Sequence, residues 1–400
     1  MEHDPIARAA RRLDALCLSH SDRHVGGPGV AAANDLFASA VSAAGWRVER
    51  IAFDCVDWTH IEARLSARGT KWSLHVGPYS PPYSGEAPLV GIATVEALEA
   101  LESPGAILLL HGQIAAEQVT PRNYPFYQMD AHVRLLAALD RAAPAAVIAA
   151  TDRTPVAAAL HPFPLFEDAD LGFPSAYLLD TQAAALLAHA GERVHLEIDS
   201  AQFRARSEQL VARLEGRSSR RVTVCAHIDS RHGTPGALDN ATGVCMLLAI
   251  ADLLGDRTPA LTVELLPFNG EDNFAAYGEM AYLARHGETL GDIALAINID
   301  AAGRRGDESA ISFYGCTDEL RERVRALVAE APHIVEGPEW PMSDHMVFAM
   351  RGVPAMAVTS TGLLDIVAEV AHTAADVPSL ADPGLIVATA HFIADVAAAM

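Results

Sequence analysis

The sequence predicts an α/β fold in which a mixed, largely parallel sheet is flanked by helices, together with a smaller inserted α+β domain. First, from about Ala201 onward short apolar strands alternate with helices, which is typical of a parallel sheet. Second, the stretch between residues 58 and 199 has a different pattern, in which prolines interrupt a series of short apolar runs. Third, half of the 400 residues are apolar, which is enough for a large core.

The first 57 residues are expected to form a helix, a Gly/Pro turn at residues 26–29, and a second helix. The second helix should cover Ala31–Ala44, because Gly45 is a typical residue just after a helix C-terminus. Arg47–Phe53 then alternates in polarity as a half-buried strand does.

Short apolar runs in the middle of the chain are interpreted as buried strands between helices. They are Leu89–Ile92, Ala106–Leu110 and Ala145–Ala149. We therefore assign residues 58–199 to a separate, smaller domain.

The last 200 residues contain the clearest strand–helix alternation. The strands expected there are Arg221–Ala226, Leu261–Phe268 and Ile293–Asp300. The helices expected there are Gly243–Leu254, Ala275–His286 and a final helix that starts at Asp382-Pro383. Asp239-Asn240 are good N-cap residues for the first of these helices, and proline in the first turn suits the last.

Polar side chains with metal-binding chemistry follow each of these three strands. The first strand runs into His227 and Asp229, the second into Glu271-Asp272, and the third ends at Asp300. Ligands of open α/β sheets bind in the crevice beyond the carboxyl ends of the strands, and imidazole with carboxylate is a zinc-binding combination. The sequence therefore predicts a metal site at this edge of the sheet.

Two further residues complete the pattern. Asp239 lies in a Gly-containing turn just before a helix, and His372 lies in a loop before the last helix. The combined set of two histidines and several carboxylates is about what two zinc ions with a bridging carboxylate require.

Composition restricts the partners. The formal net charge of −22 argues against nucleic acid and against anionic membrane surfaces. The N-terminal residues lack the apolar core of a signal peptide and no membrane-spanning segment is expected, so the expected location is the cytoplasm. The five cysteines form no CxxC pair and are interpreted as buried apolar residues.

Other catalytic templates are absent from the sequence. It contains no HExxH helix, no GxSxG elbow and no GxxxxGK[ST] loop. The remaining histidines are interpreted as ordinary surface or core residues; they include His24, His60, His161, His232, His286 and His333.

Five segments together resemble the M28-type zinc peptidases, which include bacterial leucyl aminopeptidases and glutamate carboxypeptidase. In chain order they read AHIDSRHGTPGALDNATG, LLPFNGEDNFAAYGE, INIDAAG, SDHMVFAMRGVP and HTAAD. The resemblance covers roughly Ala201 to the end, and HVGGPGVAAANDLFASAVSAAGW is similar to the N-terminal helices of the family. The middle region resembles the protease-associated domain that some members carry as an insertion. The resemblance therefore implies that residues 58–199 are an inserted domain and that residues 1–57 and 200–400 together form the catalytic domain.

The resemblance implies a role for each site residue. His227 and Asp300 would hold one zinc ion, Asp272 and His372 would hold the other, and Asp239 would bridge them. Cobalt or manganese can occupy such sites as well. Glu271 would be the general base, and Asp229 a positioning carboxylate. Asp344 and His345 would lie near the site, and Asp376 would orient its loop.

Two positions depart from the family pattern. The family usually has Glu-Glu where this chain has Glu271-Asp272, so the shorter Asp272 must approach its metal more closely or bind it more loosely. Ala371 stands before His372, where some members have a tyrosine that stabilises the oxyanion.

The function expected from the resemblance is that of a metal-dependent aminopeptidase acting on peptides. Two other enzyme functions stay open: a carboxypeptidase or dipeptidase, for which Arg304, Arg305 and Arg351 would be candidate carboxylate-binding residues, and a glutaminyl-cyclase-like acyl transfer. A non-catalytic binding protein that kept the fold, as transferrin receptors have, is the alternative from another class. A homodimer is compatible with the sequence.

Overall fold

The computed structural model describes residues 4–102, 104–122, 124, 129–167, 169–273 and 275–400. The chain divides into two compact units: Met1–Cys55 with Arg206–Met400, and Val56–Ala205. Two long strands, β1 (Arg47–Ala67) and β7 (Arg193–Leu214), connect them along the chain. We call the first unit the main unit and the second the inserted unit.

The inserted unit is built on a sheet with the order β2-β6-β5-β4-β3-β7, and β1 pairs with β2. Strands β3, β4, β5 and β6 are parallel to one another, and the pairs β2–β6 and β3–β7 are antiparallel. Its elements are β2 (Thr70–Val76), β3 (Tyr83–Ile92), α3 (Val95–Glu99), β4 (Ile107–Leu110), α4 (Asp130–Ala142), β5 (Ala146–Thr151), β6 (Ser175–Leu179) and α5 (Ala183–Leu187).

The short apolar runs predicted as strands form β3, β4 and β5, which confirms that expectation. Alternate residues of β4 belong to two different cores: Leu108 and Leu110 pack in one cluster, Ile107 and Leu109 in the other. Both faces of the strand are therefore covered, which explains why the run is continuously apolar rather than alternating.

The main unit carries the strand order β7-β9-β8-β10-β13-β11-β12. The central strands β9, β8, β10 and β13 are mutually parallel, whereas β7 and β11 run antiparallel to β9 and β13. The predicted mixed, largely parallel sheet is thereby confirmed. The strands are β8 (Ser218–His227), β9 (Leu261–Phe268), β10 (Ile293–Ile299), β11 (Ser309–Tyr314), β12 (Ile334–Glu336) and β13 (Ala355–Ser360).

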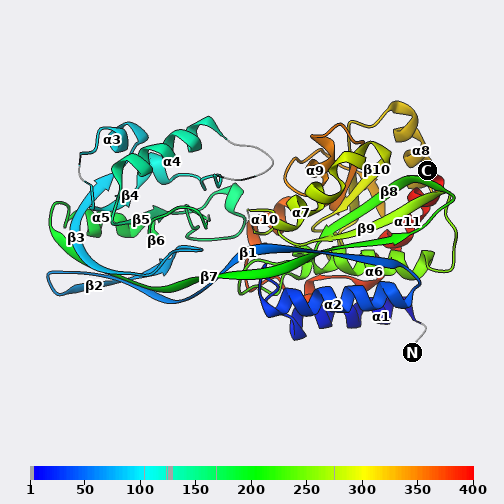
Figure 1. The fold of residues 1–400 in the computed structure, drawn as a ribbon, viewed down its shortest axis with the longest axis horizontal. Helices are drawn as coiled ribbons and strands as arrows, with labels where there is room; N and C mark the ends of the chain where they lie inside the picture. The colour runs from blue at the N-terminus through cyan, green and yellow to red at the C-terminus, as the bar shows by residue number, and fades with distance from the viewer. Residues whose placement is uncertain (1–3, 103, 123, 125–128, 168, 274) are drawn as a thin grey trace. The chain divides into compact units, whose positions relative to one another are not determined.

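Helices cover both faces of this sheet (Figure 1). Helices α1, α2, α6 and α11 pack together on one face, whereas α7 and α9 lie on the other. The helices of the main unit are α1 (Pro5–Asp14), α2 (Pro28–Ala43), α6 (Thr242–Leu254), α7 (Tyr277–His286), α8 (Asp318–Val328), α9 (His345–Ala349), α10 (Leu363–Glu369) and α11 (Pro383–Ala399). Asp382 caps α11 by accepting hydrogen bonds from the backbone of Gly384 and Leu385.

One helical stretch of the main unit, Ala237–Leu254, is long and apolar enough to cross a membrane. It combines a π-helical turn, η5 (Ala237–Ala241), with α6. Because 78% of the stretch is buried within the fold, it has the burial of a core helix.

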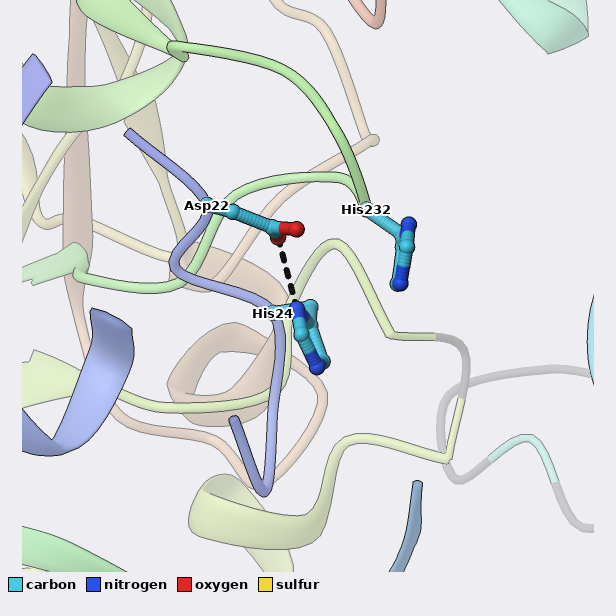
Figure 2. A group of neighbouring side chains, drawn as sticks. All are labelled: Asp22, His24 and His232. Atoms are coloured by element: carbon cyan, nitrogen blue, oxygen red, sulfur yellow. Dashed lines mark hydrogen bonds and ion pairs between the residues drawn. The ribbon is translucent and has the colours of Figure 1, made fainter. Parts of the chain in front are cut away.

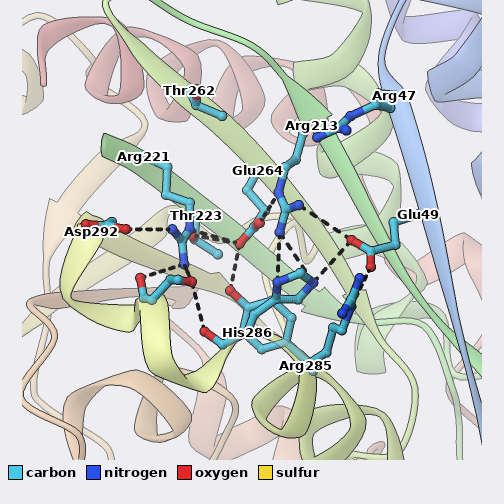
Figure 3. Close-up of polar contacts among 12 residues, drawn as sticks. Arg47, Glu49, Arg213, Arg221, Thr223, Thr262, Glu264, Arg285, His286 and Asp292 are labelled. Carbon is cyan, nitrogen blue, oxygen red and sulfur yellow. Dashed lines mark hydrogen bonds and ion pairs between the residues drawn. The ribbon is translucent and has the colours of Figure 1, made fainter. Parts of the chain in front are cut away.

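A buried charge network ties β9 to its neighbours (Figure 3). The fully buried carboxylate of Glu264 accepts hydrogen bonds from Arg213 on β7 at 2.6 Å and from the Tyr282 hydroxyl on α7 at 2.7 Å. Thr223 on β8 donates a third, at 3.2 Å. A buried carboxylate is tolerated only when it is paired and hydrogen-bonded in this way. The network therefore holds β7, β8 and α7 in fixed positions relative to β9.

Candidate metal centre

The predicted ligands emerge from three adjacent parallel strands. His227 is the last residue of β8, Asp272 lies in the loop after β9, and Asp300 follows β10 directly. Since the sheet order is β9-β8-β10 and the pairing is parallel, these residues meet at the same edge. This is the crevice in which open α/β sheets bind ligands.

The first group of potential ligands is His227, Asp239 and Asp300. The Nε2 atom of His227 lies 3.1 Å from Oδ1 of Asp239 and 3.5 Å from Oδ1 of Asp300. One ligand atom from each residue lies within 4.8 Å of the others, which suits a single cation.

The second group is Asp239, Asp272 and His372. The Nε2 atom of His372 lies 3.1 Å from Oδ1 of Asp272 and 3.4 Å from Oδ2 of Asp239. Asp239 thus turns Oδ1 toward the first group and Oδ2 toward the second. The two groups share one carboxylate through different oxygens, which is the geometry of a bridging ligand.

His227 is oriented for metal binding by its other ring nitrogen. Nδ1 lies 3.2 Å from the backbone oxygen of Asp229, where it can donate a hydrogen bond and leave Nε2 for a metal. The carboxylate of Asp229 accepts a hydrogen bond of 2.9 Å from the backbone of Gly270, in the loop that carries Asp272. Burial raises the pKa of Asp229 to about 6; the charge of His227 opposes this rise and that of Asp272 adds to it.

Asp376 fixes the turn that presents Asp239. Its carboxylate accepts hydrogen bonds from the backbone of Leu238 at 2.8 Å and of Asp239 at 3.0 Å. Burial and the charge of Asp239 raise the pKa of Asp376 to about 6, although these two hydrogen bonds lower it. Asp376 therefore holds the backbone of the bridging residue.

Arg23, from the N-terminal segment, holds the other side of the same turn. Its fully buried guanidinium donates hydrogen bonds of 2.7–2.9 Å to four backbone carbonyls, those of Leu16, Ile228, Pro235 and Gly236. Gly236 has a φ of +53°, and a Cβ there would lie 2.4 Å from the backbone oxygen of Asp239. Only glycine therefore allows the turn to close this tightly.

The prediction of Asp239-Asn240 as N-cap residues is wrong in position, because α6 begins at Thr242 and its N-cap residue is Ala241. Asn240 accepts a hydrogen bond from the backbone of Gly243 at 3.1 Å and donates one to the backbone oxygen of Ile299 at 2.7 Å. It thereby links the start of α6 to the end of β10. The Asp239 carboxylate is turned toward the histidines instead.

The charges of the site favour cations. Burial raises the pKa of Asp239, and the charge of Asp272 raises it further, although both histidines lower it. Burial lowers the pKa of His227, but Asp300 and the hydrogen bond to Asp239 raise it well above its ordinary value. His227 Nε2 and Asp272 Oδ2 are buried without a hydrogen-bond partner among the described residues. The donor set and its excess negative charge therefore fit a pair of divalent cations.

Glu271 lies beside these ligands but belongs to neither ligand group. Burial raises its pKa well above the ordinary value; the charge of His227 opposes this rise, and the carboxylates of Asp300, Asp272 and Asp239 add to it.

The SDH segment packs behind the site. The Ser343 hydroxyl donates a hydrogen bond of 2.7 Å to Oδ2 of Asp300 and so orients that ligand. Asp344 is fully buried, and burial with the charges of Glu279 and Glu271 raises its pKa well above the ordinary value. His345 is also buried, and its Nε2 lies 2.8 Å from the backbone oxygen of Trp340. Burial lowers the pKa of His345 to about 4, so it is neutral at pH 7.

Several residues that hold the site were not among the candidates from the sequence: Arg23, Gly236, Glu279 and Ser343. Glu279 on α7 is fully buried, and burial together with the charge of Asp229 raises its pKa to about 8. Ser343 stands within the SDH segment, which was the available signal. Arg23 lies more than 200 residues from the turn that it binds, and no local pattern marks it.

We expect Asp376→Asn to lower metal affinity about 10–100-fold, the usual effect of losing a residue that orients a ligand. The amide can accept at one atom only, and its NH₂ group would oppose a backbone N–H. Zinc affinity is measured by competition with a chromogenic chelator. The matched control is Asp382→Asn, which also changes a carboxylate that accepts two backbone hydrogen bonds, at the start of α11. Equal affinities in both variants would contradict the role given to Asp376.

The fold and part of the sequence are similar to known proteins. The chain is 28% identical over 232 residues to leucine aminopeptidase 1 of Arthroderma gypseum; the match covers 52% of this chain and 62% of that relative, so the chain spans under two thirds of the relative's length. Its fold matches an aminopeptidase from Aneurinibacillus sp. strain AM-1 (TM-score 0.75, 18% identity, 98% of this chain and 92% of the other). It also matches a zinc aminopeptidase from Bacillus subtilis (TM-score 0.71, 17% identity, 98% and 94%). Residues 209–397 match the sequence model of peptidase family M28, and this part of the chain is therefore similar to that family.

Proposed function

We propose that this chain is a metal-dependent aminopeptidase that hydrolyses the N-terminal peptide bond of peptides. The observation that carries the proposal is the shared carboxylate of Asp239, whose two oxygens face two separate His/Asp groups. The match of residues 209–397 to the model of peptidase family M28 and the names of the similar proteins support it further.

His227 and Asp300 would hold one cation, Asp272 and His372 the other, and Asp239 both. Zinc suits this nitrogen and oxygen donor set, and cobalt or manganese could replace it. Once bound, two such cations act as Lewis acids toward the scissile carbonyl and lower the pKa of an attacking water.

Glu271 would move the proton. It accepts a proton from the attacking water as the new C–O bond forms, and it donates that proton to the amine nitrogen as the C–N bond breaks. Asp229 does not contact the peptide in this scheme. It orients His227 through its backbone oxygen and the β9 loop through its carboxylate.

The structure disfavours a carboxypeptidase, since the three candidate arginines are engaged within the protein. Arg305 and Arg351 donate hydrogen bonds to the backbone oxygens of Ala381 and Val347, at 2.7 and 2.9 Å. Arg304 lies 3.7–3.9 Å from the carboxylates of Asp307 and Asp365. A glutaminyl-cyclase-like reaction remains the alternative, because it would tolerate weaker binding at the Asp272 group. A non-catalytic role is disfavoured by the intact ligand set.

We expect Glu271→Gln to keep its metal and to lose turnover. The amide cannot accept the proton from water, so kcat should fall by about 10²–10⁴-fold. Zinc content and kcat are measured on the same preparation. Asp300→Asn is the contrasting variant, because it changes a ligand and should lose metal as well as activity. Near-normal kcat in Glu271→Gln would rule out its assignment as the base.

We expect cleavage of substrates with a free N-terminal amine only. Aminoacyl-anilides, N-acylated dipeptides and peptides with N-terminal glutamine are compared in the presence of chelator and after zinc is added back. Chelator should abolish hydrolysis of the anilides and zinc should restore it. Cleavage of the N-acylated dipeptides would indicate a carboxypeptidase, and cyclisation of the glutamine without hydrolysis would indicate a cyclase.

A further inference from the structure

A second cluster of metal-binding side chains lies in the main unit, outside the two ligand groups that share Asp239. It consists of Asp22, His24 and His232, whose side chains point toward one another (Figure 2). One nitrogen or oxygen from each lies within 4.8 Å of the others, the same criterion that both groups at Asp239 satisfy. The first two residues precede α2, and His232 lies in the loop between β8 and η5.

Backbone pairing brings these two segments together. The backbone N–H of Arg23 donates to the hydroxyl of Ser230 at 3.2 Å, and the backbone N–H of Ser230 donates to the carbonyl of Arg23 at 3.3 Å. Arg23 is buried, whereas its neighbours Asp22 and His24 are partly exposed. Arg23 therefore holds this segment against the loop of Ser230, and Asp22 and His24 on either side of it remain accessible to solvent.

The ring of His24 has little freedom to move. A Cβ at Gly27 would lie 2.5 Å from its Cε1 and 2.6 Å from its Nε2, so the ring packs directly against the glycine backbone. Its Nδ1 lies 2.6 Å from Oδ1 of Asp22. The ring of His232 lies beside it, with centroids 4.5 Å apart and planes tilted by 34°.

We propose that Asp22, His24 and His232 bind a further transition-metal ion, with zinc as the best-suited metal. Two imidazoles and one carboxylate are borderline ligands of the kind that zinc prefers, and three protein ligands leave a fourth position for water. An ion bound to both residues would take the place of the contact that joins Nδ1 of His24 to Oδ1 of Asp22. This inference does not rest on the proposed peptidase activity.

The site has a structural consequence. The segment from His227 to Asp239 would carry ligands of both centres, with His232 between them in sequence. An ion at His232 would fasten this segment to residues 22–24, in addition to the hydrogen bonds of Arg23. The site was not predicted from the sequence, because each histidine alone has the pattern of an ordinary surface residue. The two segments are joined by the hydrogen bonds between Arg23 and Ser230.

The test is a count of tightly bound zinc per chain, measured by plasma mass spectrometry after dialysis against buffered zinc. We expect wild-type protein to bind one more equivalent than His232→Ala. The matched control is His391→Ala, which removes an exposed histidine on α11 and should match wild type. Because the readout is a difference between variants, it is independent of how many ions the centre at Asp239 holds and of any activity.

Two further variants keep the test decisive if His232→Ala folds poorly, as judged by circular dichroism. Asp22→Asn keeps the size of the side chain and removes its charge, and Gly27→Ala keeps all three ligands but displaces the His24 ring. Both should bind one equivalent less than wild type, or bind the last equivalent at least about 10-fold more weakly. Equal zinc counts and affinities in wild type, His232→Ala and Asp22→Asn would overturn the proposal and leave a hydrogen-bonded Asp–His pair.

Discussion

The arrangement of this site depends on the carboxylate of Asp239, which turns one oxygen to each of two His/Asp groups. A carboxylate can serve both groups only if its backbone is fixed, because each oxygen must meet a different nitrogen. Three contacts provide this. Asp376 holds the backbone N–H of Asp239, Arg23 holds the carbonyls before it, and Asn240 ties the next residue to β10. They come from sequence positions more than 300 residues apart.

The carboxylates of the site lie close together and are largely buried, so their negative charges repel one another. Burial and mutual repulsion raise the pKa values of Asp229, Asp239 and Glu271, so these carboxylates are destabilised as anions. Divalent cations would remove this repulsion. The positions of the ligand atoms and the excess negative charge both favour the binding of divalent cations, although they are independent properties of the site.

Much of the site follows from local sequence patterns. Strands β8, β9 and β10 could be placed within a few residues, because each is an apolar run that ends in a polar residue, and parallel pairing then brings those polar residues together. The bounds of β9 are those predicted. The ligand roles came from resemblance to a family rather than from spacing. What could not be predicted is long-range: β1 was expected to end at Phe53 but extends to Ala67, because its continuation pairs with β2.

The supporting residues escaped prediction for a related reason. The guanidinium of Arg23 donates to four backbone carbonyls, and any residue type supplies a carbonyl, so these contacts leave no complementary charge in the sequence. Glu279 lies on an amphipathic helix, where a glutamate normally faces solvent, yet it is fully buried. Such roles depend on tertiary contacts with distant parts of the chain and not on the neighbouring residues in the sequence.

The central claim is that one carboxylate joins two cation sites. Anomalous X-ray diffraction at the zinc absorption edge, from crystals grown with zinc, tests it directly. The account requires two neighbouring peaks, one beside His227 and Asp300 and the other beside His372 and Asp272, with Asp239 between them. Peaks that leave Asp239 in contact with fewer than two ions would contradict it.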